Sequence, residues 1–386
     1  MSAVPGEPRA RGKGWIRVLR VALLAASAAL LASALRDADL GRAGALVVRM
    51  GPWCVLVLLP ALLGNGLQTL GWRPVLELLG CRVRAGVLLL VRVASEAVFM
   101  TAPAGTAVAD STALWMLERR LGVPVPAGLA ALAARRTLLV LTNGLYVALA
   151  FVLGHAYLER AATGLGGGPW LAWLVLGMAG ILLGSSALMA AALLSGNLAG
   201  WLRRLLERFP LRASRAWLAA RAAGFAETDR HLASLRRAPR GRLGASVAAF
   251  SLAWLTDALD TMIVLRLVGG HLGFVQILAV EVLVSLMRSV AFALPSAVGV
   301  QDVGYVTLFA AFGLPDAATV GLAFLILKRA KEIVWIAIGY AILLVFGQGR
   351  RTATGAGLVA SSGAGRTLAN GTNPTAGPSV AKASRW

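Results

Sequence analysis

The sequence predicts an all-α protein that crosses a membrane several times, with about six full spans and two proline-broken re-entrant hairpins arranged as an inverted repeat. Of the 386 residues, 58% are hydrophobic and only 14% are charged, and the mean hydropathy is +0.75. A soluble domain usually carries about 25% charged residues. The apolar residues form long blocks, close to the ~20 residues that cross a bilayer core. This composition excludes a soluble enzyme, a coiled coil and a disulfide-stapled secreted domain.

The expected membrane domain covers residues 15–347, between a basic tail at 1–14 and a Gly/Ser/Thr/Ala-rich tail at 348–386 that we expect to be disordered. The first apolar block ends in Ala32-Ser33-Ala34, which also fits a signal-peptidase site, so cleavage is an alternative to an uncleaved first span. The apolar blocks lie at 15–35, 45–70, 85–102, 104–117, 128–153, 170–198, 243–268, 272–294, 295–314 and 316–347.

The positive charge of the chain follows the pattern of a membrane protein. There are 38 Lys and Arg residues against 17 Asp and Glu, a formal net charge of +21. In a soluble chain this excess would suggest nucleic acid. Here it lies in short loops and tails, as the positive-inside rule requires of cytoplasmic segments, so we expect no nucleic-acid partner. In the most basic segment, 199–242, apolar residues interleave with arginines. That mixture fits amphipathic helices on anionic headgroups or, equally well, solvated cytoplasmic helices.

The basic loops set the expected topology. The loops at 71–86 and 199–242 should both be cytoplasmic, so an even number of crossings lies between them. The blocks 128–153 and 170–198 supply two crossings, and 85–117 is therefore expected to enter and leave on the cytoplasmic side. The same reasoning makes the second hairpin open from outside and places both termini in the cytoplasm. Hairpins that enter from opposite faces predict an inverted repeat.

Sequence matches between the two halves support this repeat, with the first half at about 85–153 and the second at about 272–347. Asp110 follows Pro103 at the spacing at which Asp302 follows Pro295, and a Gly-x-Pro motif closes each unit. Broken helices in inverted repeats commonly build a binding site at the bilayer midplane, because unwound backbone is tolerated only along a polar cavity or inside protein. The expected helix breaks are Pro103, Gly105, Pro295 and Gly299.

Many charged residues lie inside the apolar blocks, where each costs at least ~2.5 kcal/mol on insertion scales. One interpretation is that they only pair with each other, as Glu96 would with Arg92 one turn earlier. Asp257, Asp260 and Glu281 fit pairing and a functional role equally well. The basic residues in the middle of the block 316–347 instead favour a cavity for an anionic ligand, because arginine and lysine suit a phosphate-bearing headgroup. The intramembrane charges are Arg92, Glu96, Asp110, Arg135, Arg136, Asp257, Asp260, Glu281, Arg288, Asp302, Lys328, Arg329, Lys331 and Glu332.

Neither a metal site nor a cofactor is expected from the sequence. The three histidines are scattered, and the two cysteines, Cys54 and Cys81, fall in an apolar block and a basic loop, so a disulfide between them is not expected. A membrane enzyme acting on an isoprenoid or phospholipid would need a nucleophile or a metal-binding motif. The chain contains no HxxxxD or Ser-His arrangement, so we do not expect an enzyme.

The second half resembles a known family signature. The stretch Ala293–Tyr305 (ALPSAVGVQDVGY), followed by Phe312-Gly-Leu-Pro315 and Leu327-Lys-Arg329, is similar to the "LPxxxGvqE…G…R" pattern of the lysylphosphatidylglycerol synthase transmembrane (flippase-like) family. Ser95–Val98, Pro103 and Asp110 resemble its first-half pattern, particularly in the branch associated with hopanoid biosynthesis. Two acidic positions that are commonly Glu in that family are Asp here. The resemblance covers about 45–347 and implies a protein that moves or handles membrane lipids.

Combined with the intramembrane charges, the resemblance implies a bacterial inner-membrane lipid translocase for an anionic or terpenoid lipid. In this hypothesis, Glu96, Asp110 and Asp302 gate or orient the cations of the cavity, and Lys331 has a less defined role. A non-transporting partner that recruits lipid-biosynthesis proteins through 199–242 is the main alternative, and a lipid-modifying enzyme is a weaker one. The residues expected to hold the lipid headgroup are Arg135, Arg136, Arg288, Lys328 and Arg329.

Overall fold

The computed structural model describes residues 32–33, 35–102, 105–164, 168, 170–195, 222–237, 239–290 and 299–348. Most of the expected first span, the break residues Pro103 and Pro295, residues 199–221 and the tail beyond Gln348 lie outside the described residues. Chain contacts divide the protein into Met1–Ile342 and Leu343–Trp386, and the account below concerns the first of these units.

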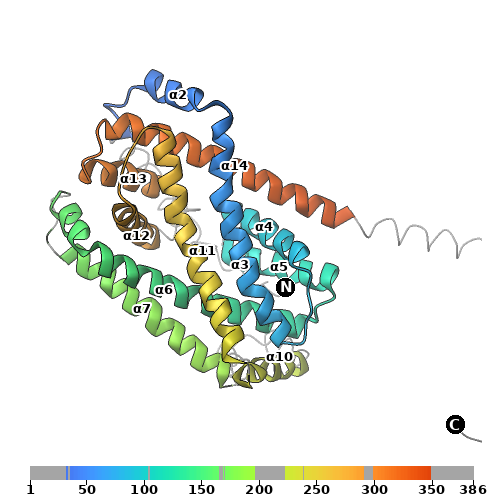
Figure 1. Cartoon of the computed structure of the whole chain (residues 1–386). Helices are drawn as coiled ribbons and strands as arrows, with labels where there is room; N and C mark the ends of the chain where they lie inside the picture. The colour runs from blue at the N-terminus through green and yellow to red at the C-terminus, as the bar shows by residue number, and fades with distance from the viewer. Residues whose placement is uncertain are drawn as a thin grey trace, which may run out of the picture. The chain divides into compact units, whose positions relative to one another are not determined.

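Helices account for all the regular structure of the described residues, as the sequence predicted (Figure 1). Before the basic segment they are α2 (Leu40–Arg49), the 3₁₀ helix η1 (Gly51–Leu58), α3 (Leu59–Leu78), α4 (Ala85–Thr101), α5 (Gly105–Leu121), α6 (Val125–Gly164) and α7 (Trp170–Leu194). After it come α10 (Ala222–Ser234), η2 (Leu235–Arg237), α11 (Arg240–Leu267), α12 (Phe274–Val290), α13 (Val300–Ala311) and α14 (Ala317–Gln348).

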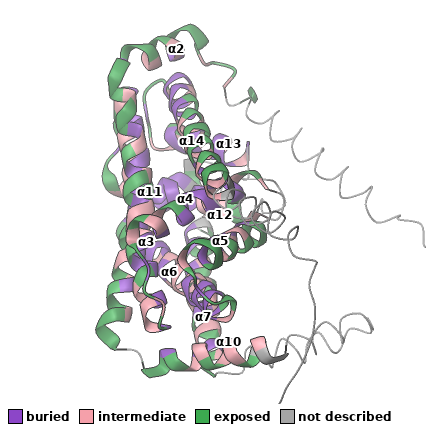
Figure 2. Ribbon diagram, turned by 90° about the vertical axis from the view of Figure 1, so that its right-hand side faces the viewer, coloured by how far each residue is buried: buried purple, intermediate pink, exposed green. Residues whose placement is uncertain are grey.

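The apolar block expected at 45–70 is divided differently in the structure. Its first residues belong to α2, a short, mostly exposed helix that ends where Gly51 takes a φ of +50° and Pro52 follows (Figure 2). The continuous span then runs over Gly51–Leu78, past the end of the block. Arg73 is therefore helical, stabilised by an ion pair of 2.9 Å with Glu77 one turn later. The basic loop that the sequence placed at 71–86 begins after this helix.

The two halves contain the same series of helices. A long helix (α3 or α11) is followed by two shorter helices packed against each other (α4–α5 or α12–α13) and then by the longest helix of that half (α6 or α14). In Figure 1, α3 runs away from α2 towards α10, whereas α11, packed beside it, runs from α10 towards α12. The first helices of the two halves therefore run in opposite directions, as expected of an inverted repeat.

The ends of the second short helices also correspond. Gly122 and Gly313 follow α5 and α13, with φ values of +64° and +75°. Glycine adopts this left-handed conformation without the steric cost that a Cβ would bring, and it ends helices for this reason. The next residue after each glycine folds back, since Val123 donates its N–H to Leu117 O (3.1 Å) and Leu314 donates to Phe309 O (2.9 Å). The Gly-x-Pro motif identified in the sequence is thus a pair of matching helix ends.

Four of the described helical segments are long and apolar enough to cross a membrane: Gly51–Leu78, Val125–Ala161, Ala172–Leu194 and Arg240–Leu267. Large apolar side chains such as Leu62, Trp173 and Ile181 are exposed along them. A bilayer would bury these side chains, because lipid replaces the protein core as their apolar surroundings. The chain is therefore a multi-pass membrane protein. Helix α14 has the length of a span, but it carries Lys328, Arg329, Lys331 and Glu332 near its middle.

Small residues allow α3 and α11 to approach closely. A Cβ built on Gly64 would lie 2.6 Å from Thr256 Oγ1, and one built on Gly71 would lie 2.9 Å from the Phe250 ring. Gly66, on the same helix, has no atom within 4 Å of its built Cβ. Close backbone approach through small residues is the main source of helix association in lipid, where burial of apolar surface contributes little.

We expect the variant Gly71→Leu to destabilise the protein by about 1–3 kcal/mol, because its side chain would overpack against the buried Phe250 ring. The matched variant Gly66→Leu should leave stability nearly unchanged. Thermal unfolding in detergent, followed by intrinsic tryptophan fluorescence, measures both. Equal melting temperatures for the two variants would contradict the close packing of α3 on α11.

Candidate functional site

A cavity of about 490 Å³ lies between the two halves of the repeat. Side chains from α3, α4, α5 and α6 line one part of it, and side chains from α11, α12, α13 and α14 line the other. Six of the predicted site residues reach this cavity: Glu96, Asp110, Arg135, Arg136, Arg288 and Lys328. Side chains that are distant in the sequence therefore meet in one space, as expected of a site built by an inverted repeat.

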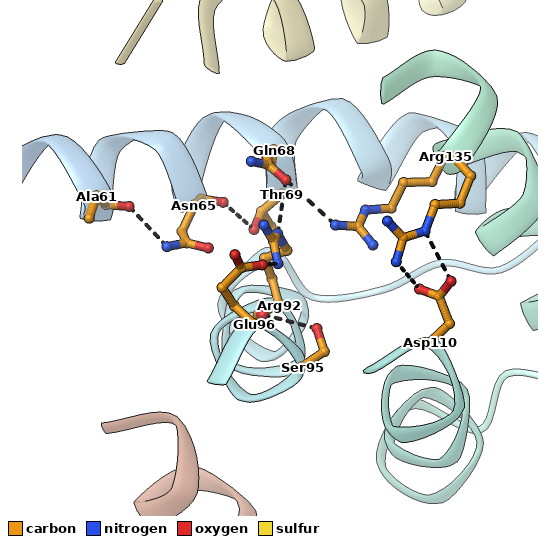
Figure 3. A network of polar contacts seen from close by, with 10 residues as sticks. Ala61, Asn65, Gln68, Thr69, Arg92, Ser95, Glu96, Asp110 and Arg135 are labelled. Atoms are coloured by element: carbon orange, nitrogen blue, oxygen red, sulfur yellow. Dashed lines mark hydrogen bonds and ion pairs between the residues drawn. The ribbon is translucent and has the colours of Figure 1, made fainter. Parts of the chain in front are cut away.

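In the first half, a polar network connects α3, α4 and α6 (Figure 3). Arg92 forms an ion pair with Glu96 one turn later, and its Nε donates a hydrogen bond of 2.9 Å to Gln68 Oε1. Arg135 reaches the same Gln68 oxygen at 3.5 Å and lies over the buried Trp72 ring, 4.9 Å from its centroid. Arg92 and Arg135 are both almost fully buried. The pairing of Glu96 with Arg92 that the sequence offered as the simpler interpretation is present.

Asp110 and Arg136 connect α5 to α6. The guanidinium donates two hydrogen bonds, from Nε to Oδ2 (2.9 Å) and from Nη2 to Oδ1 (2.8 Å). Such a bidentate pair is the strongest kind of carboxylate contact that arginine makes. The helix that carries Asp110 begins at Gly105, where a Cβ would overlap the carbonyl oxygen of Phe99. Gly105 therefore permits the tight connection at the predicted break, which positions Asp110 opposite Arg136.

The second half repeats this pair in α13 and α14. Arg329 Nη2 lies 2.6 Å from both carboxylate oxygens of Asp302, and its Nη1 donates to Glu332 at 2.6 Å. Asp302 also accepts a hydrogen bond of 3.2 Å from the N–H of Gly299, the residue before α13. Gly299 has a φ of +88°, so this predicted break is a helix start that a carboxylate caps.

A second, buried polar chain lies beside this pair. Lys328 Nζ donates a hydrogen bond of 2.6 Å to the Tyr305 hydroxyl, which in turn donates to Glu281 Oε1 at 2.8 Å. The Thr261 hydroxyl donates to the same Glu281 oxygen at 2.5 Å. The Lys328 ammonium also lies 4.2 Å from the centroid of the Tyr305 ring. Lys328 on Tyr305 thus corresponds to Arg135 on Trp72 in the first half, since each is a cation over an aromatic ring and precedes the arginine of an Asp–Arg pair.

The cavity exposes the two Asp–Arg pairs unequally. Asp110 and Arg136 line it, with 26% and 30% of their side chains accessible. In the second pair Asp302 is only 7% accessible and Arg329 is 27% accessible, and neither is among the described lining residues. The predicted headgroup-binding residues Arg136 and Arg329 are thus both occupied by carboxylates. Among the predicted cations, Arg135, Arg288 and Lys328 line the cavity without a carboxylate partner in the described part of the chain.

The cavity is less basic than the sequence suggested. Its described lining contains six basic side chains and six acidic ones, so the formal charges balance. The acidic residues of α11, α12 and α14 account for the difference. Lys331 pairs with Asp260, and Arg329 with Glu332, so part of the positive charge of α14 is neutralised locally. The basic lining residues are Arg92, Arg135, Arg136, Arg288, Lys328 and Lys331, and the acidic ones are Glu96, Asp110, Asp257, Asp260, Glu281 and Glu332.

Two polar residues of α3 also belong to the site, although they were not among the predicted site residues. Asn65 and Gln68 line the cavity, and they occupy the positions in the first half that Asp257 and Asp260 occupy in the second. Asn65 and Asp257 are the same number of residues apart as Pro103 and Pro295, and so are Gln68 and Asp260. Extending the repeat one helix towards the N-terminus would have found them. Uncharged polar residues are less conspicuous in an apolar block than charged ones, because they cost less to insert.

The family model described as "Lysylphosphatidylglycerol synthase TM region" matches residues 17–330. The match includes both Asp–Arg pairs, whereas Lys331 and Glu332 lie beyond its end. A comparison with curated proteins found no match for the chain.

We expect Arg329→Ala to lower the free energy of unfolding by about 3–5 kcal/mol, because it leaves the buried Asp302 carboxylate without its partner. As the control, Arg42→Ala breaks an exposed pair with Asp316 and should cost about 0–1 kcal/mol. Denaturant unfolding in mixed micelles measures both. A double variant, Asp302→Leu with Arg329→Met, should be more stable than Arg329→Ala, and the reverse order would contradict a buried pair.

Proposed function

Because this chain belongs to the lysylphosphatidylglycerol synthase TM region family, we propose that it moves a phosphate-bearing lipid across the membrane. The observation that carries the proposal is the unequal exposure of the two matching Asp–Arg pairs. Asp110 and Arg136 both line the shared cavity, whereas Asp302 is buried and neither it nor Arg329 is among the described lining residues. An inverted repeat allows two such states, because exchanging the conformations of the halves opens the cavity to the other face. The observed state would be one of the two.

In this mechanism, the Asp–Arg pairs hold the hairpins, and the cations without a carboxylate partner hold the headgroup. Arg288 is exposed to the cavity near the end of α12, and Lys328 is held in place by Tyr305. Both can approach a phosphate without first breaking an ion pair of the described residues. Arg135 is more deeply buried, against Trp72, so its positive charge lies further inside the protein than those of Arg288 and Lys328. Lipid tails would remain in the bilayer while the headgroup passes through the polar cavity.

The proposal requires no chemical step and no cofactor. Recognition of a phosphate needs cations and hydrogen-bond donors, and these side chains supply both. We further propose that the protein lies in a bacterial cytoplasmic membrane with both termini in the cytoplasm. The loop between α3 and α4 would then face the cytoplasm, and membrane lipids would be its principal partners. Lipid-biosynthesis proteins could bind at 199–242, whose first part lies outside the described residues.

The direct test is lipid exchange in liposomes that contain the purified protein, with fluorescent anionic, zwitterionic and terpenoid lipids. We expect accelerated exchange of phosphate-bearing lipids, and a decrease of at least about tenfold for Arg288→Gln combined with Lys328→Gln, since each lost contact to a charged group costs about 1.5–3 kcal/mol. Arg266→Gln removes one exposed positive charge at the end of α11 and is the control. Equal exchange by the control and the double variant, or no acceleration by the wild type, would contradict the proposal.

The orientation can be tested with the natural cysteines. Cys81 lies in the loop between α3 and α4, and burial raises the pKa of its thiol. At neutral pH less of this thiol is ionised than of an exposed cysteine, and reaction with a membrane-impermeant maleimide should accelerate as the pH rises. In a Cys54→Ala background, we expect labelling of inside-out vesicles and none of intact spheroplasts. The opposite pattern would place this loop outside.

A further inference from the structure

Asp257 differs from the other five acidic residues that line the cavity. Each of those five has a partner among the described residues. Glu96 pairs with Arg92, Asp110 with Arg136, Asp260 with Lys331 and Glu332 with Arg329, while Glu281 accepts hydrogen bonds from Thr261 and Tyr305. Asp257 is exposed to the cavity and forms neither a hydrogen bond nor an ion pair with any described residue. It is thus the one lining carboxylate without a direct partner among the described residues.

The surroundings of Asp257 contain charges of both signs on several helices. An ionised carboxylate without a partner is costly at membrane depth, and binding a proton removes that cost. In the other five carboxylates, a proton would weaken an existing ion pair or hydrogen bond. The titratable and charged groups that face Asp257 are Tyr146 from α6, Asp260 from α11, Glu281 and Arg288 from α12, and Lys328 and Lys331 from α14, with the neutral Asn65 and Gln68 on α3.

The first half of the repeat shows that a neutral group is accommodated at this position. The residue that corresponds to Asp257 is Asn65, whose amide has nearly the shape of a protonated carboxylic acid. Asn65 donates a hydrogen bond of 2.9 Å to Ala61 O, in the preceding turn of α3 (Figure 3). The substitution Asp257→Asn therefore places in the second half the residue type found in the first half, and its amide resembles a protonated Asp257.

We propose that Asp257 binds a proton and thereby couples movement of an anionic lipid to a transmembrane proton gradient. The coupling follows from the charge balance of the cavity. With Asp257 ionised, the six basic and six acidic lining side chains cancel. When Asp257 accepts a proton from water on one side, one positive charge is left in excess, and the cavity attracts an anionic headgroup. Release of the lipid on the other side restores the balance when the proton leaves to water there.

This proposal rests on the lipid movement proposed above and adds its energy source. Because one proton and one singly charged lipid cross together, the process is electroneutral, and the pH difference alone sets its direction. Linkage requires that the proton and the lipid strengthen each other's binding by the same factor. With one proton per lipid, a tenfold ratio of proton concentrations supports up to about a tenfold ratio of lipid between the leaflets.

The experiment uses the full-length protein in liposomes with a pH difference of about one unit, close to the tenfold proton ratio above. Labelled phosphatidylglycerol is the lipid probe, and an internal pH dye follows the protons. For the wild type, we expect labelled lipid to accumulate about threefold to tenfold in the leaflet that faces the alkaline side. Asp257→Asn should move lipid equally with and without the gradient and should take up no protons with it. Asp37→Asn, which removes an exposed carboxylate outside the cavity, should behave as the wild type does.

The outcomes separate the two proposals. If the wild type exchanged lipid equally with and without the pH difference, the proton coupling alone would be overturned. If it exchanged no lipid under any condition, the proposal of lipid movement itself would be overturned. Gradient-dependent exchange by Asp257→Asn would overturn the role of Asp257. If that variant changed only the movement of amine-bearing lipids, Asp257 would bind the amine and the proposal would also fail. Should Asp257→Asn not fold, the wild type in weakly buffered detergent still decides, because adding phosphatidylglycerol must raise the pH of the solution.

Discussion

The arrangement of this protein depends on one interaction that occurs twice, the pairing of an aspartate on the helix after a break with an arginine on the following long helix. The pairs Asp110–Arg136 and Asp302–Arg329 each join two separate helices, which the backbone hydrogen bonds within a helix cannot connect. At membrane depth, each charge would be costly alone. The pair therefore determines where a hairpin rests against its long helix, and the cavity is the space that remains between the two halves.

The two pairs are related by the repeat, but their surroundings are not the same. Asp302 caps the first turn of α13, since the N–H of Gly299 bonds to it, whereas Asp110 lies further along α5, towards the cavity. A symmetric sequence pattern thus supports an asymmetric structure. That asymmetry matters for the proposed lipid transport, because a cavity open equally to both faces would leak, and one open to neither would trap its ligand. The balanced charges of the lining also let a single proton change its net charge.

Much of the fold follows from local rules that the sequence displays. Apolar length predicted the helices from α4 to α7 and from α11 to α14 to within a few residues at most ends, and Gly-x-Pro predicted the ends of α5 and α13. The prediction was weakest where two effects compete. The block 45–70 contains Gly51 and Pro52, which end α2. The ion pair between Arg73 and Glu77 stabilises the last turns of α3, which extends beyond the apolar stretch. A hydropathy pattern contains neither effect, so it misplaced both boundaries.

By itself, the sequence determined the all-helical membrane class and the set of intramembrane charges, and it predicted an inverted repeat and its helix breaks, because length, proline, glycine and charge act locally along the chain. Only the tertiary structure decided which charges meet. Arg136 and Arg329 are occupied by aspartates, Lys328 is held by Tyr305, and Asp257 is left without a partner among the described residues. Which residues on different helices become partners depends on their distance and direction across the packed interface, and the spacing of residues in the sequence does not contain this information. The balance of charge in the cavity, and with it the proposed chemistry, is therefore a property of the folded protein.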